Sequence, residues 1–121
     1  MRFLTRMVIA VCLLVPTISQ ATEAWSVCQT ITSVQNYMAY ANAVSLTLSP
    51  GISGCSGEGV AGGIAFTIGT DGVTSTNISG FLASGLAAYL SGTQVMIYYD
   101  TSVTGCAGVI IATGGNAGQC P

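Results

Sequence analysis

The chain has 121 residues, of which only six carry a formal charge; it has no histidine, and its two arginines lie within the first six positions. This composition excludes Ser-His-Asp and Cys-His catalysis, Schiff-base lysines and the usual histidine-containing zinc centres. It also excludes nucleic-acid binding, which requires lysine or arginine to neutralise phosphates. We therefore expect a protein that is not an enzyme and that needs no cofactor or metal.

The first 21 residues have the pattern of a secretory signal peptide. Two arginines precede the apolar run Met7–Val15, and Ser19-Gln20-Ala21 offers a small-x-small cleavage site. The apolar run is too short to span a bilayer, which takes about 20 residues. We expect a secreted or periplasmic protein with a signal peptide at 1–21 and a single domain at 22–121. Thr22-Glu23-Ala24 would also allow a slightly later cut.

After this cut the remaining charged side chains are all acidic: Glu23, Glu58, Asp71 and Asp100. A glycosidase needs only a pair of carboxylates, but these four are dispersed along the chain, so we expect solvated loop charges. Asp71-Gly72 is typical of a turn, and this turn lacks the further acids of a calcium site.

Four cysteines remain in the expected mature chain, namely Cys28, Cys55, Cys106 and Cys120. An even number in a small exported domain predicts two disulfides. The alternative, a four-thiolate zinc site, lacks the usual close C-x-x-C spacing. Three pairings are possible, and these residues alone do not choose among them.

Alternation of side chains and runs of β-branched residues predict five strands. In the second of them, apolar and hydroxyl residues alternate, so Val44, Leu46 and Leu48 should face the core. The glycine-rich stretch 52–63 should be a loop held by a disulfide. The expected strands are 25–34, a segment ending in 44–48, 64–68, 95–99 and 106–113.

One segment, Phe81 to Leu90, has helical spacing of its apolar residues. Asn77 or Ser79 should cap its start, and Gly92 should end it in the left-handed conformation. We expect its core-facing side chains to be Leu82, Leu86 and Tyr89.

The other face of this helix has no charged residue and carries Ala83, Ser84, Ala87 and Ala88. Small residues four positions apart allow another backbone to approach closely, so this face predicts a homo-oligomer. The alternative is an alanine-rich face in contact with solvent, because alanine is the best helix former.

Three strands, a helix and two further strands match the oligonucleotide/oligosaccharide-binding (OB) fold. We therefore expect a mostly β protein: a five-stranded antiparallel OB-fold barrel with one helix between strands three and four. The same order also fits a small α+β sheet with the helix on one face.

The stretch from Leu90 to Asp100, LSGTQVMIYYD, resembles the B subunits of subtilase cytotoxin and their small secreted bacterial relatives. In that family a helix end leads through a glycine into a V-x-I-Y-Y strand followed by an acid. The resemblance implies an OB-fold barrel that forms a homopentamer around its helices. Such an AB5-type toxin subunit binds cell-surface glycans, often sialylated, and delivers a separate catalytic A subunit.

The resemblance also implies glycan-binding residues. The second tyrosine of the Y-Y pair holds the sugar in the toxin subunit, and its position here is Tyr99. A serine following an aromatic residue also contacts the sugar, and Ser26 after Trp25 corresponds to it. The alternative for Tyr99 is core packing, because Val95, Ile97 and Tyr99 share one face of a strand.

In such a barrel the loops after strands two and four lie at the same end. This favours a Cys55–Cys106 disulfide and leaves Cys28 to pair with Cys120. A function of another class is also open: a secreted or periplasmic structural or protein-interaction barrel with no sugar site.

Overall fold

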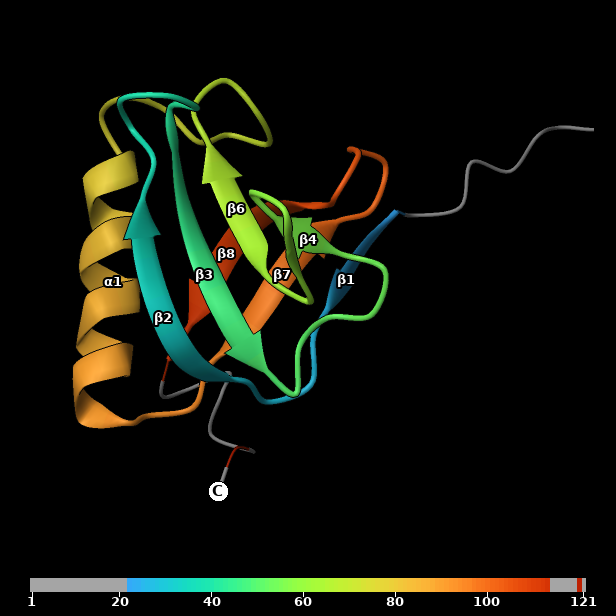
Figure 1. Cartoon of the computed structure of the whole chain (residues 1–121), viewed down its shortest axis with the longest axis vertical. Helices are drawn as coiled ribbons and strands as arrows, with labels where there is room; N and C mark the ends of the chain where they lie inside the picture. The colour runs from blue at the N-terminus through green and yellow to red at the C-terminus, as the bar shows by residue number, and fades with distance from the viewer. Residues whose placement is uncertain (1–21, 114–119, 121) are drawn as a thin grey trace, which may run out of the picture.

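The protein is mostly β with a single helix, as seen in a computed structural model that describes residues 22–113 and 120 (Figure 1). Within this part of the chain no helix has the length and apolar character needed to cross a membrane. The elements in chain order are β1 (Glu23–Trp25), β2 (Thr30–Asn36), β3 (Ala43–Ser49), β4 (Ser56–Gly57), β5 (Val60–Ala61), β6 (Ile64–Thr67), α1 (Ile78–Ser91), β7 (Met96–Asp100) and β8 (Ala107–Ala112).

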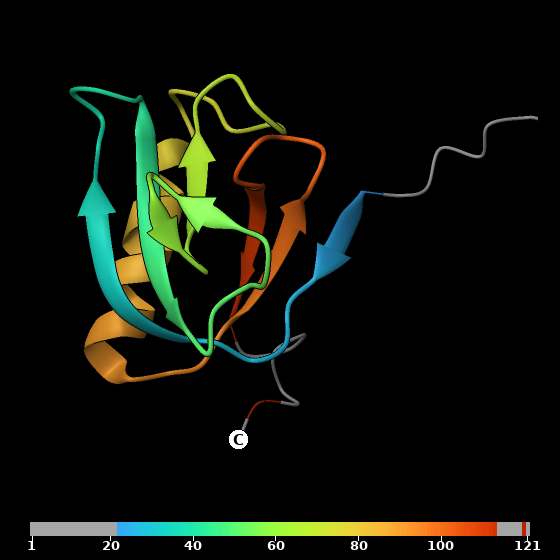
Figure 2. The ribbon, with the colours of Figure 1, turned by 45° about the vertical axis from the view of Figure 1, so that its right-hand side comes forward.

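The strands form three small antiparallel sheets, with the orders β2-β3-β6, β1-β7-β8 and β4-β5. Figure 2 shows the two larger sheets beside each other, with α1 behind the first and the β4–β5 hairpin in front. A bridge between Gln29 and Val95 joins the larger sheets, with backbone N–H···O distances of 2.7 and 2.8 Å.

The strand pairing differs in two places from the expected five strands. The first expected strand is interrupted at 26–29 and becomes β1 and β2, and the expected loop at 52–63 contains the β4–β5 hairpin. Among the described residues the paired strands do not form one closed sheet, so a closed five-stranded barrel is not observed. The helix α1 lies between β6 and β7, which correspond to the expected third and fourth strands, so its predicted position is confirmed.

The core lies between the sheets and the helix, and the alternation predicted for β3 is confirmed. Val44, Leu46 and Leu48 are 1%, 0% and 6% exposed. Between them Ser45 points to the opposite face, where the β4–β5 hairpin covers it; a Cβ on Gly57 would lie 2.7 Å from the Ser45 hydroxyl. The sheet is therefore buried on both faces at β3.

The helix turns a different face to the core from the one expected. Leu82 packs against the core, but Leu86 and Tyr89 are 39% and 44% exposed. Phe81 stacks on Phe66 with ring centroids 4.6 Å apart. The residues buried on the helix are Ile78, Gly85 and Ala88.

Close packing explains this rotation of α1. A Cβ on Gly85 would lie 3.0 Å from Cδ2 of Leu46, so the glycine lets the helix approach β3 closely without a shift of the Leu46 side chain. The larger side chains beside Gly85 are consequently left at the surface. Ala88, expected on the outer face, is 3% exposed and belongs to the core.

The helix end at Gly92 was predicted correctly. Of the two expected caps, Asn77 precedes the helix and Ser79 lies inside its first turn, and Asn77 acts differently from the prediction. Gly92 follows the last turn with φ 69°, as expected of a left-handed C-cap. Asn77 precedes the helix but makes no capping bond to it. Its Oδ1 accepts from the Thr74 amide at 2.7 Å and its Nδ2 donates to the Gly72 carbonyl at 2.9 Å, so it holds the preceding turn.

Two disulfides join segments that are far apart in sequence, and both are the pairs favoured above. Cys55–Cys106 links the segment after β3 to the loop between β7 and β8, and Cys28–Cys120 links the β1–β2 connection to the end of the chain. Bridges that close long loops restrict the unfolded chain and stabilise small domains by about 2–4 kcal/mol each.

Gly108 provides a test of the packing between β6 and β8. A Cβ at this position would lie 2.6 Å from the Phe66 ring, so we expect Gly108→Ala to destabilise the protein by about 1–3 kcal/mol. Chemical denaturation measures this loss. Gly80→Ala on the helix surface, where a Cβ meets nothing within 4 Å, is the matched control and should stabilise by up to about 1 kcal/mol. Equal effects of the two substitutions would contradict this packing.

Candidate functional site

A partly exposed row of large side chains crosses the β1-β7-β8 sheet. Trp25 is paired in register with Tyr98, and Tyr98 with Ile110, so the three lie side by side on adjacent strands. The rings of Trp25 and Tyr98 have centroids 5.1 Å apart and are tilted by 46°. Trp25 and Ile110 are 41% and 44% exposed. We call these three residues the aromatic row.

A carboxylate fixes the Tyr98 ring within this row. The Tyr98 hydroxyl donates to Oε2 of Glu23 at 3.0 Å. This hydrogen bond, together with burial and the negative charge of Glu23, raises the pKa of the Tyr98 phenol. The row is therefore a pre-arranged surface with π faces and a hydrogen-bond acceptor at one end.

The two residues predicted to bind glycan lie next to this row, where Ser26 is buried and Tyr99 is half-buried. Ser26 is 6% exposed; its hydroxyl donates to the Val27 carbonyl at 2.7 Å and accepts from the Ile97 amide at 2.9 Å. Tyr99 is half-buried and packs against the core. The structure thus gives Ser26 a role in joining β1 to β7, and sugar contact by Ser26 and Tyr99 stays a prediction.

Sequence reasoning missed Trp25 and Tyr98 as a pair. Their proximity depends on the register of β1 against β7, which short-range patterns do not specify. One signal was available: adjacent residues of a strand point to opposite sides, so an inward Tyr99 implies an outward Tyr98.

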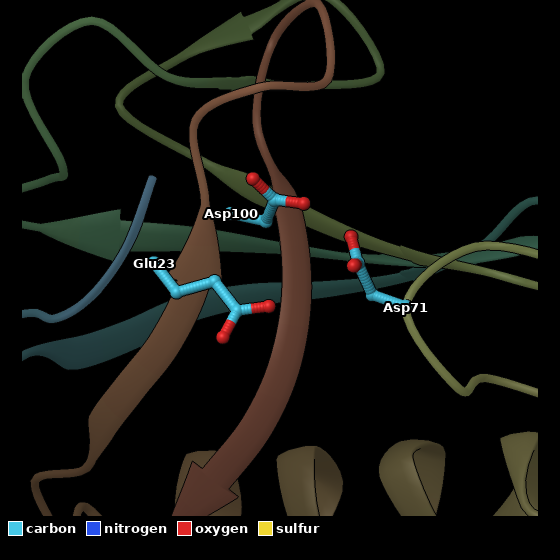
Figure 3. A group of neighbouring side chains, drawn as sticks. All are labelled: Glu23, Asp71 and Asp100. Atoms are coloured by element: carbon cyan, nitrogen blue, oxygen red, sulfur yellow. The ribbon is translucent and has the colours of Figure 1, made fainter. Parts of the chain in front are cut away.

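Three of the four acids of the expected mature chain meet beside the aromatic row. Glu23 comes from β1, Asp100 from β7 and Asp71 from the loop after β6 (Figure 3). Each offers a carboxylate oxygen within 4.8 Å of the others. We call these residues the carboxylate trio. The expectation of solvated loop charges was wrong for Asp100, which lies on a strand and is 7% exposed. Separation in sequence did not reveal that these acids meet in space.

The local environment moves the pKa values of two of these acids in opposite directions. Burial and then the negative charge of Asp100 raise the pKa of Asp71, and its Oδ2 is buried with no hydrogen-bond partner in the described part of the chain. Hydrogen bonds from Ser102 lower the pKa of Asp100, including one from the Ser102 amide to Oδ1 at 2.8 Å. The trio therefore contains one charge compensated by hydrogen bonds, at Asp100, and one poorly compensated charge, at Asp71.

Carboxylate oxygens are hard ligands of the kind preferred by Ca²⁺ and Mg²⁺. The trio offers the further acids that the Asp71 turn lacks locally, although Ca²⁺ takes about 6–8 oxygen ligands and three carboxylates supply only part of such a shell. A pair of carboxylates with divergent pKa values is also the arrangement of a glycosidase. Asp100 is, however, 7% exposed and directed at neighbouring protein groups rather than at an open cleft.

A second polar feature is a hollow of about 340 Å³ beside the Cys55–Cys106 bridge. It lies between the β4–β5 hairpin and the loop that precedes β8, and Glu58 is the charged residue in its wall. Hydroxyl groups line much of it, from Ser56, Thr67, Thr70 and Thr104. It contains no aromatic ring against which a sugar could stack.

Comparisons of the chain with protein-family models, with curated proteins and with solved structures gave no match.

Asp100 provides a test of the electrostatics of the trio. We expect Asp100→Asn to lower Tm by several degrees at neutral pH, because an amide accepts weaker hydrogen bonds from Ser102 than a carboxylate does. Since the pKa of Asp100 is lowered by folding, its contribution is present above the unfolded-state pKa and is lost as the pH falls through the folded-state value.

The difference in Tm between wild type and Asp100→Asn should therefore shrink between about pH 7 and about pH 2. Thermal melts followed by circular dichroism measure it. Glu58→Gln, in the turn between β4 and β5, is the control and should leave Tm unchanged. A difference independent of pH would show that Asp100 acts through packing alone.

Proposed function

We propose that this protein is a secreted, non-catalytic glycan-binding module of the AB5 toxin B-subunit type. The observation that carries the proposal is the aromatic row, in which the exposed Trp25 ring packs beside the half-buried Tyr98 ring on the β1-β7-β8 sheet. Aromatic faces attract the C–H surface of a pyranose ring because their π clouds carry partial negative charge. A site of this kind needs no cationic side chain, and the expected mature chain has none.

Polar groups for such a ligand lie at the edge of the row. The Glu23 carboxylate has acceptor capacity beyond the bond from Tyr98, and hydroxyl groups of a sugar are natural donors to it. A sialic acid would have to be oriented with its own carboxylate away from the trio, since like charges repel. This favours recognition through the neutral face of the sugar.

Secretion is part of the proposal. The signal-peptide pattern supports it, and so do the two disulfides, because such bridges persist in oxidising compartments. We also propose that the fold is a variant of the OB barrel. The succession β2-β3-β6 and β8-β7-β1 supports this, with Gln29 and Val95 joining the sheets and Phe66 of β6 packed on Gly108 of β8.

Assembly into a homo-oligomer, a pentamer by analogy with the family, completes the proposal. The outer face of α1 supports it: Leu86, Tyr89 and Leu90 are 39%, 44% and 80% exposed and no charge lies on the helix. An exposed apolar surface of this kind marks an interaction site in soluble proteins. Repeated weak glycan sites in one ring would gain affinity by multivalency, and the ring could carry a catalytic A subunit.

The second candidate is an interaction barrel without a sugar site, and the same helix face favours it. The two candidates differ in what the aromatic row does. In the first it contacts a ligand, whereas in the second it only covers the sheet.

The aromatic row gives the direct test of glycan binding. We expect Trp25→Ala to weaken binding on a glycan array by about tenfold or more, equivalent to ~1.4 kcal/mol, because it removes the larger stacking face. Tyr40→Ala is the control, since Tyr40 is 93% exposed and lies in the loop between β2 and β3, which belong to the other large sheet. Ser26→Ala and Tyr99→Phe, measured in parallel, test the residues implied by the family resemblance.

Three outcomes would count against this proposal. Binding unaffected by Trp25→Ala would remove the row from the site. The absence of binding to any glycan by the intact, disulfide-bonded protein would favour the interaction barrel. Hydrolysis of a glycoside that Asp71→Asn abolishes would make the protein an enzyme.

The helix face gives the test of assembly. We expect Leu90→Glu to convert the oligomer to a monomer, because it places a charge in a desolvated contact. Light scattering coupled to size exclusion at micromolar concentration measures the mass. Ser79→Glu, exposed in the first turn of the same helix, should leave the assembly intact. A monomeric wild-type protein would contradict the proposed ring.

A further inference from the structure

A groove runs along one side of α1, between the helix and strand β8. Its wall on the helix side consists of Asn77, Gly80, Phe81 and Ser84, and its wall on the strand side is the segment 109–111. The groove has a volume of about 300 Å³, at the lower end of the range for sites that hold small molecules. We call it the α1–β8 groove.

The α1–β8 groove continues the aromatic row. Ile110 belongs to both, because it is paired in register with Tyr98 in the row and also lines the groove. In the order β1-β7-β8 the last strand is an edge strand, and the groove lies between this edge strand and α1. Neighbouring strands are about 4.8 Å apart, so Trp25 and Ile110 are separated by about 10 Å. The row alone is therefore longer than one pyranose ring, and the groove extends the same surface.

The lining of the groove suits a second sugar residue. The side chains of Phe81 and Ile110 offer apolar surface to the C–H face of a pyranose. Ser84 is exposed, and its hydroxyl can both donate and accept hydrogen bonds. The Asn77 amide nitrogen uses one N–H on the Gly72 carbonyl at 2.9 Å, which leaves the other for a ligand hydroxyl. A few polar groups in a mainly apolar hollow are what orient a small molecule.

The two ends of this extended surface differ in charge. Glu23 lies on β1, at the opposite side of the sheet from the groove. Among the described residues, none of those that line the groove carries a charge. An acidic sugar is repelled by Glu23 and meets no such repulsion at the groove, so the groove is the end that can accept it.

The groove also lies on a different side of α1 from the surface proposed for assembly. Gly80 and Ser84 are four residues apart and share one side of the helix, as do Leu86 and Leu90. Ser84 and Leu86 are two residues apart and project to nearly opposite sides, since each residue turns the helix by about 100°. A ring that buries Leu86 and Leu90 would therefore leave the groove accessible.

We propose that the α1–β8 groove is a second sugar subsite, so that the ligand is a chain of at least two sugar residues. One residue stacks on Trp25 and Tyr98, and the chain runs across Ile110 so that the next residue enters the groove. An acidic sugar, where the ligand has one, occupies the groove end. The inference rests on the glycan binding proposed above and adds to it the length and the direction of the ligand.

Gly80 gives the test, because a Cβ there meets nothing within 4 Å and would project into open space. A glycan array carries monosaccharides together with the di- and trisaccharides that contain them. Wild type should bind the longer forms about tenfold more tightly than the single sugar, the gain expected from removing further apolar surface from water. Gly80→Val narrows the groove and should bring this ratio close to one while binding of the single sugar is kept. Ser84→Leu, which narrows the groove at a second position, should do the same.

Ser79→Val is the matched control and should keep the wild-type ratio, since Ser79 is exposed in the first turn of α1 and does not line the groove. Thermal melts establish that the variants are folded. Equal binding of single and longer sugars by wild type, or a ratio that both groove variants leave unchanged, would overturn the subsite while the proposed glycan binding stands. A changed oligomer mass in these variants with an unchanged ratio would assign the groove to subunit contacts instead. Absence of binding to any saccharide would overturn the glycan-binding proposal and this inference together.

Discussion

The lack of cationic side chains in the expected mature chain is the constraint on which the arrangement of the acidic side chains depends. Each acid has to be compensated by hydrogen-bond donors instead of by salt bridges. The Ser102 amide donates a hydrogen bond to Asp100, and the Tyr98 hydroxyl donates one to Glu23. Asp71 has burial and two like charges against it. This unequal treatment of three neighbouring acids is what makes the trio more than a set of solvated surface charges.

The packing of the core depends on glycines at the points where two elements approach each other closely. Gly85 brings α1 against Leu46, Gly108 makes room for the Phe66 ring, and Gly57 lies over Ser45. A small domain buries a smaller fraction of its surface than a large one, so close approach and the two disulfides compensate for limited size. Close approach of the helix also explains the exposed Leu86 and Leu90, since the residues beside a buried glycine cannot all be turned inward.

Local patterns predicted those features that local physics determines. The alternation in β3, the left-handed Gly92 and the position of the helix between the third long strand and the fourth follow from periodicity and backbone conformation. The disulfides followed from the relation of two loops in the expected fold. The rotation of α1 did not follow, because the hydrophobicity of Leu86 gives no information about the contact between Gly85 and Leu46.

The candidate site was harder to predict, because its parts come from segments far apart in sequence. Trp25 meets Tyr98, and Glu23 meets Asp71 and Asp100, through strand register and loop position. Asn77 shows the same difficulty on a smaller scale: it was recognised as a boundary residue, yet its side chain bonds the turn before the helix. Residue type indicated where a polar group was needed, whereas tertiary structure determined its partner.

The aromatic row and the carboxylate trio share one short element, β1. This strand contributes Trp25 to the row and Glu23 to the trio, and the same Glu23 carboxylate accepts the Tyr98 hydroxyl. Three residues cannot form a stable strand by themselves, so β1 depends on hydrogen bonds at its two ends. At one end the Ser26 amide donates to the Ile97 carbonyl, and at the other the Thr22 carbonyl accepts from the amide and the hydroxyl of Thr101. The aromatic row and the carboxylate trio therefore both depend on these two attachments of β1.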